Sequence, residues 1–274
     1  MRAPTECAVQ SADGTRIAYW RSGSGDPLVL VHGTSADHGR WARVVPALKA
    51  AFTVYAVDRR GRDASGDQEV YAIEREFEDI AAVLDDIGGP ITLVGHSYGA
   101  ICALEASLLS GSVARLILYE PPIPVGIEIY APGTLEQLAE MLAEDDREGI
   151  LMTFMTEIVR MPRAQAEQFR SLSGWDARVA LAHTVVRETQ ADERYRFDAA
   201  RWRRFTVPTL LLHGGDSPPF LVTATEIVSA ALPHSTLHVL PGQQHVAMET
   251  APELFVEAIL RFCNRRAERG RPAV

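Results

Sequence analysis

The 274-residue chain contains three cysteines and a single lysine. Cys7, Cys102 and Cys263 are far apart, odd in number and not spaced as zinc ligands, so the sequence indicates neither a disulfide framework nor a zinc site. With Lys49 as its only lysine, the chain offers almost no candidate for Schiff-base or P-loop chemistry. We therefore expect a protein that carries no metal ion and no other cofactor.

Long apolar runs are missing as well. No segment approaches the ~20 apolar residues that a membrane-spanning helix needs, and the start of the chain lacks the apolar stretch of a signal peptide. The formal net charge of −9 gives no attraction to nucleic-acid phosphates or anionic lipid headgroups. We expect a cytoplasmic monomer or homodimer that acts on a small molecule and binds neither nucleic acid nor membrane.

Short apolar segments alternate with longer segments of helical periodicity, which is typical of a mostly parallel sheet covered by helices. Residues 5–11 and 15–20 flank the dipeptide Asp13-Gly14, which suits the tight turn of an antiparallel hairpin. Six further runs are short and apolar, as buried parallel strands are: residues 28–31, 52–57, 91–94, 114–119, 209–212 and 235–240. Together these segments predict about eight strands.

Helical periodicity is clear over residues 77–87, where the apolar side chains fall on one stripe that would pack against the sheet. The acidic residues here, Glu76, Glu78, Asp79, Asp85 and Asp86, mostly occupy the opposite face. We expect them to be solvated surface rather than a metal site.

The interval of residues 122–205 breaks the alternation, because it contains helical segments only. The predicted helices are residues 135–143, 150–159, 164–172 and 177–186. Since the interval lies between the sixth and seventh predicted strands, its helices would cover the carboxyl ends of the sheet. The sequence thus predicts a core of residues 1–121 and 206–274 and a helical cap of residues 122–205.

The main chemical motif is G-x-S-x-G at residues 95–99, with Ser97 at its centre. It follows a predicted strand and opens a helix of small residues, which is the strand-turn-helix setting of a nucleophile elbow. Terminal glycines let the strand and helix approach closely while the serine adopts a strained backbone with its hydroxyl exposed. Ser97 is therefore the candidate nucleophile.

A serine hydroxyl is a poor nucleophile at neutral pH, so it requires a histidine base and a carboxylate that orients this base. Among eight histidines, His245 lies in the loop between the last predicted strand and the C-terminal helix, on the carboxyl side of the strands. His32 ends a strand and is interpreted as structural, and His96 is the variable position of the pentapeptide. His245 is the candidate base.

These motifs, in this order, resemble the α/β-hydrolase superfamily over nearly the whole chain. Residues 31–35, V-H-G-T-S, resemble its oxyanion-loop strand, and residues 58–62, D-R-R-G-R, resemble its D-x-R-G turn. The pentapeptide and the His245 loop complete the pattern. The resemblance implies an α/β fold with a mostly parallel eight-stranded sheet, covered by helices, and a helical cap inserted between strands 6 and 7.

By the same resemblance, the backbone N–H groups of Thr34 and Tyr98 would form an oxyanion hole. Ser35 is the less favoured alternative to Thr34. One departure concerns Asp63, which stands where the family usually has a second glycine, so we expect a different loop shape there.

The carboxylate that would orient His245 has two candidates. The superfamily commonly shows G-x-x-D after the seventh strand, but counting from Gly214 that position is Ser217, and Asp216 comes one residue early. A shift of one residue can turn a side chain away, although a loop can compensate. Glu120 ends the sixth strand, beside prolines that fix its backbone, and some haloalkane dehalogenases resemble this arrangement. Glu120 is preferred and Asp216 stays open, since both satisfy the chain order Ser, acid, His.

A serine at the elbow, where haloalkane dehalogenases and epoxide hydrolases have an aspartate, implies an acyl-enzyme. We expect a hydrolase of small, largely apolar esters, thioesters or lactones, with the oxyanion hole supplying much of the rate enhancement. Carbon–carbon bond hydrolysis, perhydrolysis, a non-hydrolytic cyclase or lyase reaction, and ligand binding without catalysis are the alternatives. Cap residues such as Met152 and Phe154 suit an apolar substrate, although we expect most of them to form the cap's own core.

Overall fold

The computed structural model describes residues 3–171 and 174–269. It contains one eight-stranded sheet with the strand order β1-β2-β4-β3-β5-β6-β7-β8. The strands are β1 Thr5–Gln10, β2 Arg16–Gly23, β3 Asp26–Val31, β4 Phe52–Val57, β5 Ile91–His96, β6 Val113–Tyr119, β7 Thr209–Gly214 and β8 Ser235–Leu240. Only β2 pairs antiparallel, with β1 and β4, and the other pairs are parallel. The predicted mostly parallel eight-stranded sheet is therefore confirmed.

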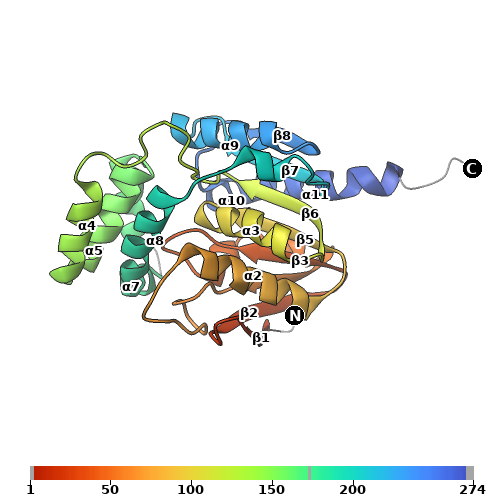
Figure 1. The fold of residues 1–274 in the computed structure, drawn as a ribbon, viewed down its shortest axis with the longest axis horizontal. Coiled ribbons are helices and arrows are strands. Elements are labelled where there is room, and N and C mark those ends of the chain that lie inside the picture. The colour runs from red at the N-terminus through yellow and green to blue at the C-terminus, as the bar shows by residue number, and fades with distance from the viewer. Residues whose placement is uncertain (1–2, 172–173, 270–274) are drawn as a thin grey trace, which may run out of the picture.

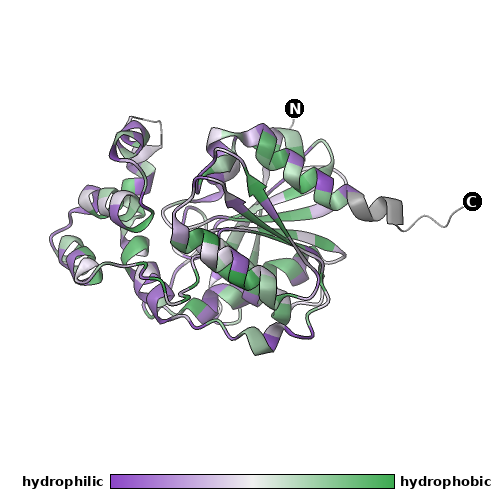
Figure 2. Ribbon diagram, turned by 90° about the horizontal axis from the view of Figure 1, so that it is seen from above, coloured by the Kyte–Doolittle hydropathy of each residue, from purple (hydrophilic) through white to green (hydrophobic). Residues whose placement is uncertain are grey.

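Helices cover both faces of this sheet (Figure 1). Alternate strand residues face opposite sides, so β3 sends Leu28 and Leu30 into one apolar cluster and Val29 and Val31 into the other. The first cluster includes side chains of α1 Val45–Leu48 and α11 Pro252–Arg269, and the second those of α2 Ile73–Ile87, α3 Tyr98–Leu109 and α9 Pro219–Ala231. Figure 2 shows the central strands as mostly hydrophobic and the outer helices as mixed. None of the helices in the described residues is both long and apolar enough to cross a membrane.

Between β6 and β7 the chain forms a group of helices that we call the inserted helices. They are α4 Thr134–Ala143, α5 Arg147–Thr153, the π-helical turn η2 Phe154–Ile158, α6 Arg163–Arg170, α7 Trp175–Ala180 and α8 Ala182–Arg194. Most of them lie together at one end of the molecule in Figure 1. The predicted helix over residues 150–159 is divided between α5 and η2, and the one over 177–186 between α7 and α8. The predicted end of the third helix, Leu172, lies outside the described residues.

Two glycines let three backbone segments meet where α3 begins. A Cβ atom on Gly99 would lie 2.2 Å from the carbonyl oxygen of His32, and one on Gly95 would lie 2.5 Å from the carbonyl oxygen of Gly99. Because these neighbours are backbone atoms, no side-chain rotation can make room. The pentapeptide therefore needs glycine at both ends for steric reasons.

We expect the substitution Gly99→Ala to lower the free energy of unfolding by about 1–3 kcal/mol or more, because the new methyl group would push α3 away from the end of β3. Urea denaturation measures this change. The matched control is Gly111→Ala, where a Cβ atom meets nothing within 4 Å. The control should leave stability unchanged or raise it by less than about 1 kcal/mol. Equal stability of the two variants would contradict the steric argument.

Candidate active site

Ser97 occupies the sharp turn between β5 and α3 with φ 55° and ψ −130°. This left-handed region is strained for a residue other than glycine and is typical of functional positions. Two hydrogen bonds hold the turn, from the Ser97 N–H to the Tyr119 carbonyl at 2.9 Å and from the Ala100 N–H to the Ser97 carbonyl at 2.7 Å. The Ser97 side chain lines two small cavities, each of about 30 Å³.

Glu120, which directly follows β6, brings its carboxylate to His245. Its Oε2 lies 2.5 Å from His245 Nδ1, and its Oε1 accepts a hydrogen bond from the Gly214 N–H at 2.7 Å. Glu120 is fully buried and has φ 48°. An ionised carboxylate only accepts hydrogen bonds, so Nδ1 carries the donated proton and Nε2 is left as the basic nitrogen.

The alternative acid, Asp216, does not reach His245. Its side chain is exposed, and its backbone N–H donates to the Gln243 carbonyl at 2.9 Å. Ser217, one residue later, has its hydroxyl oxygen buried beside Gly214. The position three residues after the glycine therefore does face inward, but it carries a serine, and the aspartate one residue earlier faces solvent. The structure brings only Glu120, of the two candidates, to the imidazole.

Two residues that the sequence did not single out anchor the loop of His245. The Nε2–H of His96 donates to the His245 carbonyl at 2.8 Å. The Tyr119 hydroxyl donates to the Gln244 carbonyl and accepts from the Ala247 N–H at 3.2 Å. Burial, and then the nearby charge of His245, keeps the pKa of His96 well below its usual value, so this ring is a neutral donor. The only sequence signal for His96 was its place inside the pentapeptide.

One of the two cavities, which we call the first cavity, is lined by Ser97 and His245. The candidate oxyanion-hole residues, Thr34 and Tyr98, line the same cavity. Tyr98 is the first residue of α3, so its N–H has no acceptor within the helix. Within the described residues no hydrogen bond joins the Ser97 hydroxyl to His245. Such contacts often form only when substrate binds. Ser35, with φ 56°, lines only the second cavity.

The prediction that the acidic residues of α2 are solvent-exposed is wrong for two of them. Glu76 and Asp79 are buried, with 0% and 1% exposure. Glu76 pairs with Arg59 at 3.0 Å, and Asp79 pairs with Arg60 through two hydrogen bonds of 2.7 Å. The periodicity of α2 placed these carboxylates away from its apolar stripe, but it could not reveal that the turn after β4 inserts arginines beside them.

The same turn is tied to the inserted helices through Glu188 of α8. Glu188 accepts from Arg59 at 3.0 Å and from Arg62, and all three side chains are fully buried. Burial alone would raise the pKa of Glu188, but Arg59 and Arg62 lower it to about 2. Glu188 also lines the cavity of Ser97. The charge network therefore forms part of the cavity wall.

Asp192, one turn further along α8, faces the same cavity with one oxygen free. Its Oδ2 accepts from the Tyr130 hydroxyl at 2.6 Å, whereas its buried Oδ1 has no hydrogen-bond partner among the described residues. Burial raises the pKa of Asp192 to about 7, and the charge of Glu188 adds to this effect. Asp192 thus titrates near neutrality inside the protein.

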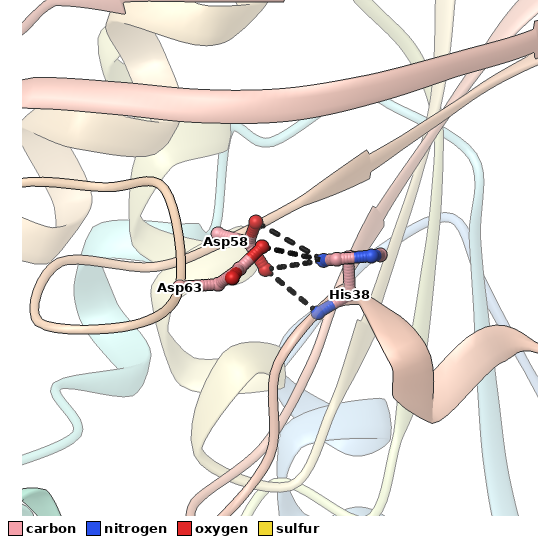
Figure 3. A group of neighbouring side chains, drawn as sticks. All are labelled: His38, Asp58 and Asp63. Atoms are coloured by element: carbon pink, nitrogen blue, oxygen red, sulfur yellow. Dashed lines mark hydrogen bonds and ion pairs between the residues drawn. The ribbon is translucent and has the colours of Figure 1, made fainter. Parts of the chain in front are cut away.

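A third cluster, drawn in Figure 3, joins His38, Asp58 and Asp63. Both oxygens of Asp58 are already engaged, because they accept from the Trp20 Nε1–H at 2.8 Å, from the His38 N–H at 2.8 Å and from His38 Nδ1. Asp63, with φ 40°, lies 3.6 Å from His38 Nδ1. We assign this cluster as an ion pair that closes the loop after β4, rather than as a metal site. Asp63 thus has a positive φ, in the left-handed region of the backbone.

The substitution Asp192→Asn tests the buried carboxyl of α8. At pH values between 3.8, the ordinary pKa of an aspartate, and about 7, the pKa in the folded protein, the folded protein keeps a proton that the unfolded chain releases. Stability contributed by Asp192 is therefore lost as pH rises through 7. We expect wild type to lose roughly 2–4 kcal/mol relative to Asp192→Asn between pH 4 and pH 8.5, measured by urea denaturation. Glu193→Gln, the same change at the exposed neighbour, is the control. A difference that does not vary with pH would contradict the prediction.

Comparison with known proteins supports the fold. A family model for the Alpha/beta hydrolase family matches residues 28–258, which contain Thr34, Ser97, Glu120 and His245. An alpha/beta hydrolase from Sphaerobacter thermophilus is 34% identical in sequence, with a TM-score of 0.84 over 93% of this chain and 99% of that chain.

Two further proteins carry a named activity. The esterase RhEst1 from Rhodococcus is 26% identical, with a TM-score of 0.76 over 95% of this chain and 98% of that chain. The 2-hydroxy-6-oxo-6-(2'-aminophenyl)hexa-2,4-dienoic acid hydrolase of Metapseudomonas resinovorans is 25% identical over 96% of this chain and 92% of that protein. Both likenesses include the inserted helices as well as the sheet.

Proposed function

The chain belongs to the alpha/beta hydrolase family, and we propose that within this family it is a serine hydrolase that forms an acyl-enzyme. The observation that carries the proposal is the contact of 2.5 Å between Glu120 and His245, which lines one cavity together with the strained Ser97. A nucleophile, a base and a carboxylate that orients the base form the arrangement that activates a serine hydroxyl.

Each side chain would have a defined role. The Ser97 hydroxyl attacks the carbonyl carbon of the substrate while His245 Nε2 takes its proton. Glu120 holds the imidazole by the Nδ1–H and stabilises its protonated form. The N–H groups of Thr34 and Tyr98 donate to the oxygen that becomes negative. His245 then protonates the leaving group, and in the second half-reaction it activates the water that releases the acid and restores Ser97.

We propose that the inserted helices act as a cap over this site. Phe154 and Ile158 of η2 line the cavity of Ser97 together with Phe220 of α9. The wall is therefore largely apolar and fits a small, largely apolar acyl compound. A cavity of about 30 Å³ holds about one water molecule, whereas ligand pockets span roughly 300–1,000 Å³. Substrate binding then requires η2 and its neighbours to move away from the sheet.

The named relatives support this class of reaction. One is an esterase and the other a hydrolase of an unsaturated oxo acid. An ester or a carbon–carbon bond beside a ketone would each present Ser97 with a carbonyl carbon to attack. We favour ester, thioester or lactone hydrolysis, because these substrates need no group beyond those in the cavity.

Labelling with a fluorophosphonate tests the nucleophile. We expect one adduct per chain, located on Ser97 by intact-mass and peptide mass spectrometry, and none on Ser97→Ala. The same preparation should hydrolyse p-nitrophenyl esters of short acids, and Ser97→Ala should lose at least about 10³-fold in kcat. Folded wild type that takes no label would overturn the proposed function.

The orienting carboxylate is tested by comparing Glu120→Gln with Asp216→Asn. We expect Glu120→Gln to lower kcat by about 10²–10⁴-fold, because a neutral amide no longer stabilises the protonated imidazole. Asp216→Asn, which removes an equal charge from an exposed loop, should retain kcat within about twofold. Steady-state kinetics on one p-nitrophenyl ester is sufficient. A crippled Asp216→Asn beside a mild Glu120→Gln would reverse the assignment.

A further inference from the structure

The second cavity beside Ser97 is lined by two arginines that the proposed reaction does not use. Arg40 comes from η1 His38–Trp41 of the core, and Arg178 comes from α7 of the inserted helices. Both line this cavity together with Ser97 and His245. The Arg40 side chain is 5% exposed and that of Arg178 is 23% exposed. A substrate at Ser97 would therefore have two largely buried guanidinium groups within its own cavity.

These two cations share a single carboxylate. Arg40 Nη1 and Arg178 Nη2 both contact Oε1 of Glu249, the latter at 3.3 Å. Arg40 Nε is buried without a hydrogen-bond partner among the described residues. The neighbouring Asp37 uses its side chain to accept from the Gly39 N–H at 2.7 Å, at the start of η1. The two guanidinium groups therefore share one carboxylate, and the Nε–H of Arg40 is a buried donor without an acceptor among the described residues.

The pKa of Arg178 reflects its position beside Arg40. The charge of Arg40, followed by burial, lowers the pKa of Arg178 to about 10. The pKa of a buried guanidinium group is rarely lowered, because such a group is usually paired with carboxylates. A bound anion would relieve the repulsion between the two arginines and supply acceptors for their free N–H groups.

The first cavity beside Ser97 has no arginine or lysine among the described residues that line it. Glu188 and Asp192 line the first cavity, where Phe154 and Phe220 provide apolar wall. An anionic group would be attracted by Arg40 and Arg178, whereas the first cavity offers it no such cation, because Arg59 and Arg62 already pair with Glu188. The charges would thus orient a substrate across the serine, with its anionic end on the arginine side and its apolar end on the other.

We propose that Arg40 and Arg178 form a subsite for a carboxylate group of the substrate. This inference rests on the proposed hydrolase function and narrows its substrate to compounds that carry a carboxylate near the scissile carbonyl, such as monoesters of short dicarboxylic acids. Guanidinium groups bind carboxylates with paired, charge-assisted hydrogen bonds, which gives geometry as well as affinity.

The test compares two esters of similar length, mono-p-nitrophenyl glutarate and p-nitrophenyl valerate. Their ratio of kcat/KM reports the preference for the carboxylate independently of the chemical step. We expect wild type to prefer the glutarate monoester, and Arg178→Met to lower the ratio by about 10- to 100-fold, through loss of one charge-assisted contact. Glu249→Gln should raise the ratio, because it removes the competing carboxylate. Arg163→Met, at an 81% exposed arginine of α6, is the matched control and should leave both kcat/KM values unchanged.

A ratio that Arg178→Met leaves unchanged in a folded protein would overturn the subsite. Binding of glutarate alone, measured by calorimetry on wild type, Arg178→Met and Ser97→Ala, separates this outcome from failure of the proposed function. If neither ester is hydrolysed and Ser97 takes no fluorophosphonate, the hydrolase proposal fails. Glutarate binding that is weakened by Arg178→Met and retained by Ser97→Ala would then still support the subsite. Absence of glutarate binding to an active wild type would refute the subsite alone.

Discussion

The structure depends most on three guanidinium groups that one turn buries. Arg59, Arg60 and Arg62 are almost completely excluded from solvent, and a buried charge without a partner costs several kcal/mol. Their partners come from different parts of the chain, Glu76 and Asp79 from α2 and Glu188 from α8. The turn after β4 thus fixes a core helix and an inserted helix at once. Because Glu188 also lines the cavity of Ser97, the same charges help to shape the site.

The site itself combines steric and polar constraints from neighbouring strand ends. Gly95 and Gly99 allow β5, α3 and the end of β3 to meet, which sets the backbone of Ser97. Glu120 extends from the end of β6, and the Gly214 N–H of the adjacent β7 fixes its carboxylate. The carboxylate that contacts His245 thus follows one strand, and its backbone hydrogen-bond donor lies on the next. His96 and Tyr119, at the ends of β5 and β6, hold the loop of His245.

Local sequence pattern predicted the sheet, the serine turn and the loop of His245, because short apolar strands and a glycine-flanked serine leave signals within a few residues. For the carboxylate that contacts His245 it preferred Glu120 and kept Asp216 open, since both follow adjacent strands and only the direction of each side chain separates them. It misplaced Glu76 and Asp79. Their partners lie 17 and 19 positions away, and the link from Arg59 to Glu188 spans 129 positions. Pairs so distant along the chain leave no periodicity that a single sequence can show.

The tie between Arg59, Arg62 and Glu188 limits how freely the parts of this molecule could be exchanged. A chimera that grafts the inserted helices of a relative onto this core would leave Arg59 and Arg62 without the carboxylate that they share, unless the donor helix carries a carboxylate at the position of Glu188. The reverse graft would bury a lone glutamate in a foreign core. Successful recombination of core and helices therefore requires that these three residues be inherited as one unit, whatever substrate the exchanged helices are chosen to admit.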